Sequence, residues 1–297
     1  MHRLRHQLAR LLTAISILFV AVCSWFSTKK RHTAFAKKQL EELEHNFKGR
    51  LGVFALNTAD GSCLTHREHE RFPVCSTFKM LVAAAILELS MRTPGLMQRR
   101  IHYTQSELVT YSPITENYVE TGMTVTDICD AVMRYSDNTA ANLLMKIVGG
   151  PSALTAFARS IGDIAFELSR WETELNTAIP GDQRDTSTPH AMGYSLQRLA
   201  LGNILGTQER KQLQDWLLSN TTGAYCIQAG VPANWKVGDK TGSGDYGTRN
   251  DIAVIWPAER PPIILTVYTT QHQQHAEKRN DVIASAAKIV ADWIQRS

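Results

Sequence analysis

The sequence predicts an α/β (α+β) fold, in which a five-stranded antiparallel sheet is flanked by the terminal helices and carries an inserted all-helical lobe. Strand-like runs occur only towards the two ends of the chain, whereas the stretch from about Pro73 to Asn220 is mostly helical. The order helix, strands, many helices, strands, helix requires both chain ends to build the sheet. We therefore expect an α/β lobe from about residues 37–70 and 220–297, and an all-α lobe from about 71–219.

The individual elements follow from hydrophobic periodicity and turn residues. Residues 37–48 have a helical apolar face, and Arg50–Asn57 is a strand that the turn Thr58-Ala59-Asp60-Gly61 connects to a second strand. The later candidates are the helices Ser76–Ser90, Val125–Tyr135, Thr139–Val148, Pro151–Ile161, Pro189–Leu201 and Gln208–Leu218, the strands Trp235–Lys240, Asn250–Trp256 and Ile263–Thr270, and a closing helix Ala276–Ile294. The polar segment Arg170–Thr188 is long for a connection in a compact chain, which predicts a functional or disordered loop.

The N-terminal 36 residues are expected to be a signal peptide. Three arginines precede an apolar run at Leu11–Phe26, and Ala34-Phe35-Ala36 offers small residues for cleavage. The run is short for a membrane span, although a retained anchor remains an alternative. Residues 1–36 hold six Lys/Arg and no Asp/Glu, so cleavage changes the formal net charge from +4 to −2. We expect a periplasmic protein with no nucleic-acid partner and no stable membrane association after processing.

Four cysteines remain after cleavage, namely Cys63, Cys75, Cys129 and Cys226. An even number in an exported protein permits disulfides. No C-x-x-C motif and no Cys/His ligand spacing is present, and the ten histidines are scattered. The sequence therefore predicts no metal site.

Ser76 and Lys79 form a candidate nucleophile pair in Ser76-Thr77-Phe78-Lys79. At positions i and i+3 of a helix the two side chains share a face, so the amine can reach the hydroxyl and serve as a base. The expected helix start also places free backbone N–H groups near a developing oxyanion. The same spacing recurs at Ser27–Lys30 and Ser285–Lys288, so the pair alone is equally compatible with a chance surface contact.

Two further motifs make Ser76 the strongest candidate nucleophile among the three S-x-x-K serines. Ser136-Asp137-Asn138 lies between two predicted helices, where it would cap the second helix or supply proton relay and substrate positioning. Lys240-Thr241-Gly242, followed by Ser243, ends a predicted strand. It is either a plain hairpin turn or an edge that pairs with a substrate amide while Lys240 meets a carboxylate.

Glu172 lies in the long loop, within Arg170-Trp171-Glu172-Thr173-Glu174-Leu175-Asn176, and Asp185 lies near the end of the loop. A loop carboxylate beside an amide can hold a water molecule against an acyl-enzyme, so that hydrolysis completes. The structural alternative is a solvated loop charge.

The three motifs S-x-x-K, S-D-N and K-T-G occur in this order, as in class A β-lactamases and penicillin-binding proteins, which the sequence resembles. The long loop resembles the omega loop of class A β-lactamases, in which an Arg–Asp pair, here Arg170 and Asp185, braces the loop. The resemblance runs from about Leu40 to Trp293 and implies the serine β-lactamase/DD-peptidase fold. It is closest to the extended-spectrum cefotaximase/cefuroximase branch, on residues 237–247 (VGDKTGSGDYG) and 250–257 (NDIAVIWP).

This resemblance implies hydrolysis of the β-lactam ring of penicillins and cephalosporins, including oxyimino-cephalosporins, through a serine acyl-enzyme that confers antibiotic resistance. The implied catalytic residues are Ser76, Lys79, Ser136 and Glu172, with Lys79 and Glu172 both open as the acylation base. The implied substrate-binding residues are Tyr111, Asn138, Asn176, Lys240, Thr241, Gly242, Ser243, Arg249 and Arg279; either arginine would assist Lys240 with the substrate carboxylate. A small-molecule β-lactam is the only partner implied for this monomer, and neither a metal nor an organic cofactor is required.

Two alternatives share the three motifs. A penicillin-binding DD-peptidase would be acylated and stay blocked, and a covalent β-lactam sensor domain would need membrane segments beyond the N-terminus. Relatives carry a disulfide at Cys129 or at Cys75, but the partner positions here are Ala83 and Gly244, so neither bridge can form.

Overall fold

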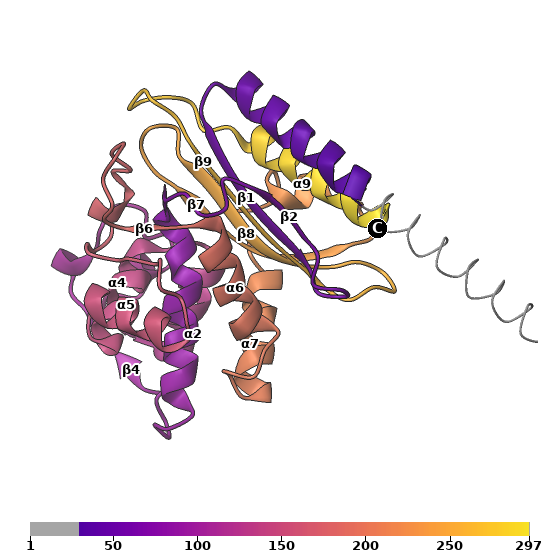
Figure 1. The fold of residues 1–297 in the computed structure, drawn as a ribbon. Helices are drawn as coiled ribbons and strands as arrows, with labels where there is room; N and C mark the ends of the chain where they lie inside the picture. Colours follow the sequence, from indigo (N-terminus) through magenta and orange to yellow (C-terminus); the bar gives the residue numbers. More distant parts are fainter. Residues whose placement is uncertain (1–29, 297) are drawn as a thin grey trace, which may run out of the picture.

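The centre of the protein is a sheet of five antiparallel strands in the order β2-β1-β9-β8-β7 (Figure 1). The structure, a computed structural model, describes residues 30–296. The strands are β1 (Arg50–Asn57), β2 (Cys63–His66), β7 (Lys236–Ser243), β8 (Arg249–Trp256) and β9 (Ile263–Thr270). β1 pairs with β9 along its whole length, which joins the two ends of the chain in one sheet. The predicted fold class is confirmed.

Two helices cover one face of this sheet, the helix over residues 30–47 and α9 (Asn280–Gln295). Figure 1 shows them side by side above the strands. The Trp293 indole N–H donates to Thr33 Oγ1 at 3.0 Å and ties the two helices together. This packing extends the first helix to positions before the predicted start at residue 37.

The predicted signal peptide falls largely on residues 1–29, which lie outside the described residues. Within residues 30–296, no helix is both long enough and apolar enough to cross a membrane.

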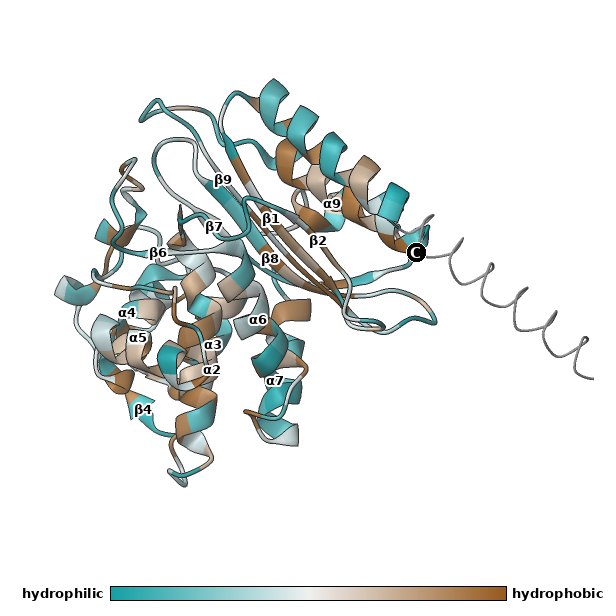
Figure 2. Ribbon diagram, viewed as in Figure 1, coloured by the Kyte–Doolittle hydropathy of each residue, from teal (hydrophilic) through white to brown (hydrophobic). Residues whose placement is uncertain are grey.

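The helices of the inserted segment lie against the opposite face, around α2 (Phe78–Ser90). The first ten residues of α2 are buried, because the helix runs through the middle of this lobe. The surrounding helices are α3 (Val125–Arg134), α4 (Asn138–Val148), α5 (Pro151–Ser160), α6 (Pro189–Ala200) and α7 (Thr207–Leu218), whereas the short helix α8 (Ile227–Gly230) packs on α9, on the first face. Figure 2 shows hydrophobic colour along β1 and β8, between the two helical layers.

Short elements complete the lobe and its junction with the sheet. They are the 3-10 turns η1 (Cys75–Thr77), η2 (Gln105–Glu107), η3 (Thr115–Asn117) and η4 (Glu174–Asn176), and the paired short strands β3 (Phe72–Pro73) with β6 (Thr186–Ser187) and β4 (Arg100–Ile101) with β5 (Met123–Thr124).

Two boundaries differ from the sequence prediction in ways that matter for the site. Ser76 lies in η1, one turn before α2, and not in the α-helix itself. α9 begins at Asn280 instead of Ala276, because the preceding segment packs as a loop on the turn after β7. In this contact Tyr246 N donates to Gln274 O and Gln271 N donates to Tyr246 O, both at 2.7 Å.

Candidate active site

Ser76 lies where η1 meets α2 and the edge strand β7. The preceding residue, Cys75, has φ of +44°, a left-handed conformation that costs of order 1–3 kcal/mol for a residue with a side chain. The turn is held from both sides, since Thr77 Oγ1 donates to Val74 O at 2.7 Å and Val74 N donates to Asp185 O at 2.9 Å. The fold therefore holds Ser76 in a strained turn with little freedom to move.

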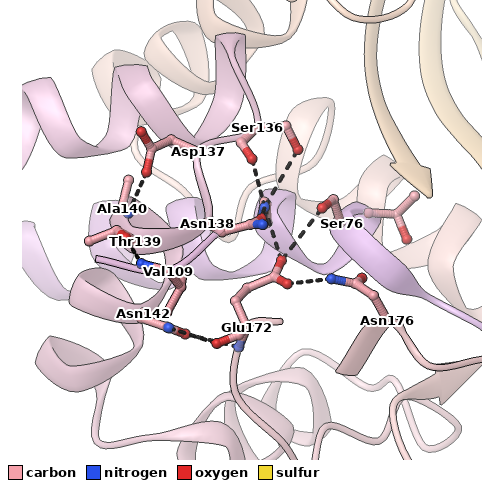
Figure 3. Close-up of polar contacts among 12 residues, drawn as sticks. Ser76, Val109, Ser136, Asp137, Asn138, Thr139, Ala140, Asn142, Glu172 and Asn176 are labelled. Carbon is pink, nitrogen blue, oxygen red and sulfur yellow. Dashed lines mark hydrogen bonds and ion pairs between the residues drawn. The ribbon is translucent and has the colours of Figure 1, made fainter. Parts of the chain in front are cut away.

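Glu172 joins the serine and the lysine of the first motif. The Ser76 hydroxyl donates to Glu172 Oε1 at 3.5 Å, and Lys79 Nζ lies 2.9 Å from the same oxygen (Figure 3). The Lys79 and Glu172 side chains are both 0% exposed. An ion pair this deeply buried is retained only when its remaining donors and acceptors are also satisfied.

Those remaining groups do have partners. Lys79 Nζ donates to Ser136 O at 2.8 Å and to Asn138 Oδ1 at 2.5 Å, so three acceptors surround its three N–H groups. Glu172 Oε2 accepts from Asn176 Nδ2 at 2.5 Å. The buried Lys79 and Glu172 side chains are therefore held by polar partners on several sides.

Asn142 fixes the backbone of Glu172, and the sequence reasoning missed it. Its side-chain amide accepts from Glu172 N and donates to Glu172 O, both at 3.0 Å (Figure 3). Asn142 follows Asn138 by four residues on α4, so the two amides share one helix face. The four-residue spacing of these two asparagines on one predicted helix is the sequence feature that could have identified Asn142 as a site residue.

Ser136 connects the two buried lysines. Its hydroxyl accepts from Lys240 Nζ at 3.0 Å and lies 3.5 Å from Lys79 Nζ. Burial, followed by the positive charge of Lys79, lowers the pKa of Lys240 to about 7. Ser136 also has a left-handed φ of +60°, which is the strained geometry often found at functional sites.

Asp137 anchors the S-D-N motif and does not face the cleft. It caps α4 by accepting from Ala140 N at 2.8 Å, and its other oxygen accepts from Ile114 N and Thr115 N. Asn138 Nδ2 donates to Thr110 O at 2.8 Å. The capping interpretation thus holds for Asp137, while Ser136 and Asn138 reach the lysines.

Gly242 explains why β7 can approach the nucleophile. A Cβ atom at this position would lie 2.9 Å from Val74 O and 3.2 Å from Ser76 N, closer than normal packing allows. A Cβ at Gly244 would lie 2.6 Å from Asn176 O and 2.8 Å from Cys75 Sγ. Glycine at these two positions therefore brings the β7 backbone against both η1 and the long loop.

Arg170 and Asp185 brace the loop that carries Glu172. Arg170 Nε lies 2.5 Å from Asp185 Oδ2, and Asp185 Oδ1 accepts the backbone N–H groups of Ser169 and Arg170 at 2.8 and 3.0 Å. Arg170 also donates to Thr177 Oγ1 at 2.9 Å. The resemblance predicted this pair, and the structure brings its two residues together.

The cleft above Ser76 has a volume of about 400 Å³. Its lining includes the predicted residues Ser76, Tyr111, Ser136, Asn138, Asn176, Thr241, Gly242, Ser243 and Arg249, together with Thr222 and Lys278, which the sequence reasoning missed. Lys79, Glu172 and Lys240 are buried, and contact the cleft-lining residues Ser76, Asn138, Asn176 and Ser136.

The structure separates the two candidate arginines. Arg249 lines the cleft, where it donates to Ser243 Oγ at 2.8 Å and to Asn280 Oδ1 at 2.7 Å. Arg279 lies outside the lining and is ion-paired with Asp281 at 2.5 Å. Both Lys278 and Arg279 precede α9, and of these two neighbours Lys278 lines the cleft.

The cysteines at residues 63, 75, 129 and 226 are all free. In the described part of the chain, no group of three or more His, Cys, Asp or Glu side chains has the arrangement of a metal site.

The chain is similar to known proteins along almost its entire length. The family described as Beta-lactamase enzyme family matches residues 35–294. Beta-lactamase OXY-2 of Klebsiella oxytoca is 50% identical over 288 residues, which cover 97% of this chain and 98% of that protein. Beta-lactamase CTX-M-8 of Citrobacter amalonaticus is 53% identical over 256 residues, covering 86% and 88%. A crystal structure of a β-lactamase from Desulfarculus baarsii DSM 2075 has a TM-score of 0.88 at 57% identity, covering 88% of this chain and 98% of that one.

Proposed function

Since the chain belongs to the class A β-lactamase family and is a β-lactamase, we propose that Ser76 and Glu172 carry its two chemical steps and that its substrates include oxyimino-cephalosporins. The observation that carries the proposal is the contact of Glu172 with Ser76, Lys79 and Asn176 in one buried cluster. Such a cluster serves both formation and hydrolysis of an acyl-enzyme.

In the acylation step Ser76 Oγ attacks the lactam carbonyl carbon. Lys79 Nζ contacts Glu172, Ser136 O and Asn138 Oδ1, and among the described residues no hydrogen bond joins it to Ser76 Oγ. Glu172, the acceptor of the Ser76 hydroxyl, is therefore the base. The N–H groups of Ser76 and Ser243 stabilise the oxyanion, in keeping with the close approach of β7 at Gly242.

Opening the ring leaves a lactam nitrogen that needs a proton. Ser136 Oγ supplies it as the ring C–N bond breaks, and Lys79, 3.5 Å away, returns a proton to Ser136 Oγ. Glu172 passes the proton taken from Ser76 to Lys79 across their 2.9 Å contact, which leaves Glu172 as a carboxylate for deacylation, while Lys240 donates to Ser136 Oγ at 3.0 Å. Lys240, Thr241 and Arg249 bind the substrate carboxylate, and Asn138 binds the acylamide side chain. Tyr111, with 57% of its surface exposed, forms one wall of the cleft.

Deacylation uses the second carboxylate oxygen of Glu172, Oε2, which faces Asn176. Asn176 Nδ2 donates to the carboxylate, while Asn176 Oδ1 is a buried acceptor that no donor in the described chain satisfies. A water molecule that donates to Asn176 Oδ1 and to Glu172 is placed against the ester carbonyl and attacks it as Glu172 takes its proton. When the ester C–O bond breaks, Glu172 returns that proton to Ser76 Oγ and the ring-opened acid leaves.

Ser243 supports the extended substrate range. It ends β7 at the cleft, and its hydroxyl is held by Arg249 Nη1 at 2.8 Å. The resemblance to the cefotaximase branch assigns this serine to the oxyimino group. Relatives of both the OXY-2 and CTX-M-8 kinds match this chain at 50% and 53% identity, so substrate kinetics must decide the branch.

The decisive experiment compares purified wild type with Glu172→Ala, using Glu174→Ala as the matched control on the same loop. Wild type and Glu174→Ala are expected to turn over a chromogenic cephalosporin continuously. Glu172→Ala is expected to accumulate the acyl-enzyme, seen by mass spectrometry, with turnover reduced at least about 1,000-fold. Unchanged turnover would contradict the role of Glu172. Cefotaxime hydrolysis that Ser243→Ala lowers more than benzylpenicillin hydrolysis would support the extended range, whereas failure to hydrolyse cefotaxime would refute it.

We further propose export to the periplasm as a monomer, supported by the charged and apolar pattern of residues 1–36. Cell fractionation with N-terminal sequencing, followed by size-exclusion chromatography, tests both statements. A cytoplasmic, uncleaved chain would contradict export, and a dimer would contradict the monomer.

A further inference from the structure

The charge of the substrate cleft is unbalanced. Its lining contains two cations, Arg249 and Lys278, and no Asp or Glu. Of the buried groups that contact the lining, Lys79 and Glu172 are paired with each other at 2.9 Å, and Lys240, which donates to the lining residue Ser136, adds a third positive group. One ring carboxylate, shared by Lys240 and Arg249 in the proposed function, leaves Lys278 without a counterpart on the substrate.

The two lining cations differ in how they are held. Arg249 donates to Ser243, Asn280 and the carbonyl of Thr222, so neutral groups orient its guanidinium. Lys278 forms no ion pair with any carboxylate of residues 30–296, although its neighbour Arg279 is paired with Asp281. Its ammonium is therefore exposed to solvent at the cleft and available to an anion.

The position of Lys278 places this charge beside the long loop. It follows the segment whose Gln274 accepts from Tyr246 N, in the turn after β7. Burial strongly raises the pKa of the Cys75 thiol, and the positive charge of Lys278 acts in the opposite direction. Cys75 lies beneath Gly244, where β7 meets Asn176, so Lys278 acts on this end of the cleft.

We propose that Lys278 is a specificity-determining residue that favours β-lactams with a second anionic group on the side chain, in addition to the ring carboxylate. The proposal rests on the proposed function, because it takes Lys240 and Arg249 as the site of the ring carboxylate. An exposed ion pair between Lys278 and an anionic substrate side chain contributes little binding energy, so the preference for such substrates is small and decreases with added salt.

The test uses two penicillins that differ by one side-chain carboxylate, benzylpenicillin and carbenicillin. Lys278→Gln is expected to lower kcat/KM for carbenicillin about three- to fivefold at low ionic strength, mainly through KM, and to leave benzylpenicillin nearly unchanged. Lys278→Glu is expected to give a larger loss for carbenicillin, and Lys278→Arg to restore wild-type kinetics. Added salt at about 0.5 M is expected to remove most of the difference.

Arg279→Gln is the matched control, since it removes the adjacent positive charge outside the lining. It is expected to affect neither penicillin. Equal losses for both penicillins in Lys278→Gln, no loss for either, or the same carbenicillin loss in Arg279→Gln would overturn the proposal. A wild-type enzyme that gives only a stoichiometric burst with both penicillins would instead overturn the proposed function, so the two failures are distinguishable.

Discussion

Asp185→Asn tests whether one buried carboxylate holds the catalytic loop in place. Asp185 is 1% exposed and accepts from Arg170 Nε and from two backbone N–H groups. An asparagine keeps an acceptor for the backbone but turns an N–H₂ group towards the guanidinium. Arg170, whose side chain is only 15% exposed, then keeps only the more distant carboxylate of Asp182, whose Oδ2 lies 3.9 Å from Arg170 Nη2.

The expected cost follows from that burial. Removing one partner of a buried ion pair destabilises by about 3–5 kcal/mol, and the backbone bonds that remain place this variant near the lower end. In a domain of this size about 3 kcal/mol corresponds to a fall in Tm of roughly 6–12 °C. The loop also carries Glu172 and Asn176, so deacylation should weaken more than acylation.

The assay is thermal unfolding together with pre-steady-state kinetics. Asp182→Asn serves as the control, because Asp182 lies on the same loop but pairs mainly with the exposed Arg184 at 2.8 Å. It is expected to cost less than about 1 kcal/mol. An Asp185→Asn variant with unchanged Tm and unchanged deacylation would refute the bracing role, and equal losses in both variants would show that the loop responds only to net charge.

Three other predictions follow from the structure. Burial lowers the pKa of Lys240 to about 7, so its positive charge is lost between pH 6 and pH 8, and KM for carboxylate-bearing substrates should rise about five- to tenfold over that range. In Lys240→Arg the guanidinium stays charged, so KM should not change with pH. Burial, followed by the charge of the nearby Asp239, raises the pKa of Asp251 well above its usual range, so the stability that the protonated Asp251 contributes is lost as pH rises through its pKa in the folded protein. The free energy of unfolding of Asp251→Asn, measured by urea denaturation, should therefore exceed that of wild type by about 1 kcal/mol at pH 8 and by less at pH 5. A larger difference at pH 5 than at pH 8 would contradict this prediction. Gly242→Ala should lower kcat/KM at least about 100-fold and leave the far-UV circular dichroism spectrum unchanged, because its Cβ would push β7 away from Ser76. The control Gly61→Ala lies in an open turn and should lower stability without affecting kcat/KM. A fully active Gly242→Ala enzyme would show that β7 tolerates this displacement.

Part of the site could be predicted from local sequence alone. The strand register brings β1 beside β9, and the short apolar runs that predict these strands are local features. The three motifs were identifiable because residue type and order do not depend on packing. Glu172 was found for the same reason, since it lies in a loop too long to be a plain connection.

Other features could be decided only by packing. Nothing in the chain near Ser76 distinguishes it from the decoy at Ser285–Lys288, which lies on α9, away from the cleft lining. The S-D-N and K-T-G motifs distinguish Ser76 in the sequence, whereas packing decided the ion pair between Lys79 and Glu172, residues 93 positions apart, which forms because the braced loop packs on η1.

Which of the cations Arg249, Lys278 and Arg279 line the cleft could likewise not be predicted from the sequence. Lys278 and Arg279 lie before α9, so the conformation of that loop, and not a helical pattern in the sequence, decides which of the two lines the cleft. The sequence by itself determined the class of the chain, its motifs and the presence of several cations near its end. The tertiary structure decided that Arg249 and Lys278 line the cleft and Arg279 does not, because β8 places Arg249 there, the loop held by contacts of Gln271 and Gln274 with Tyr246 presents Lys278, and Arg279 is paired with Asp281.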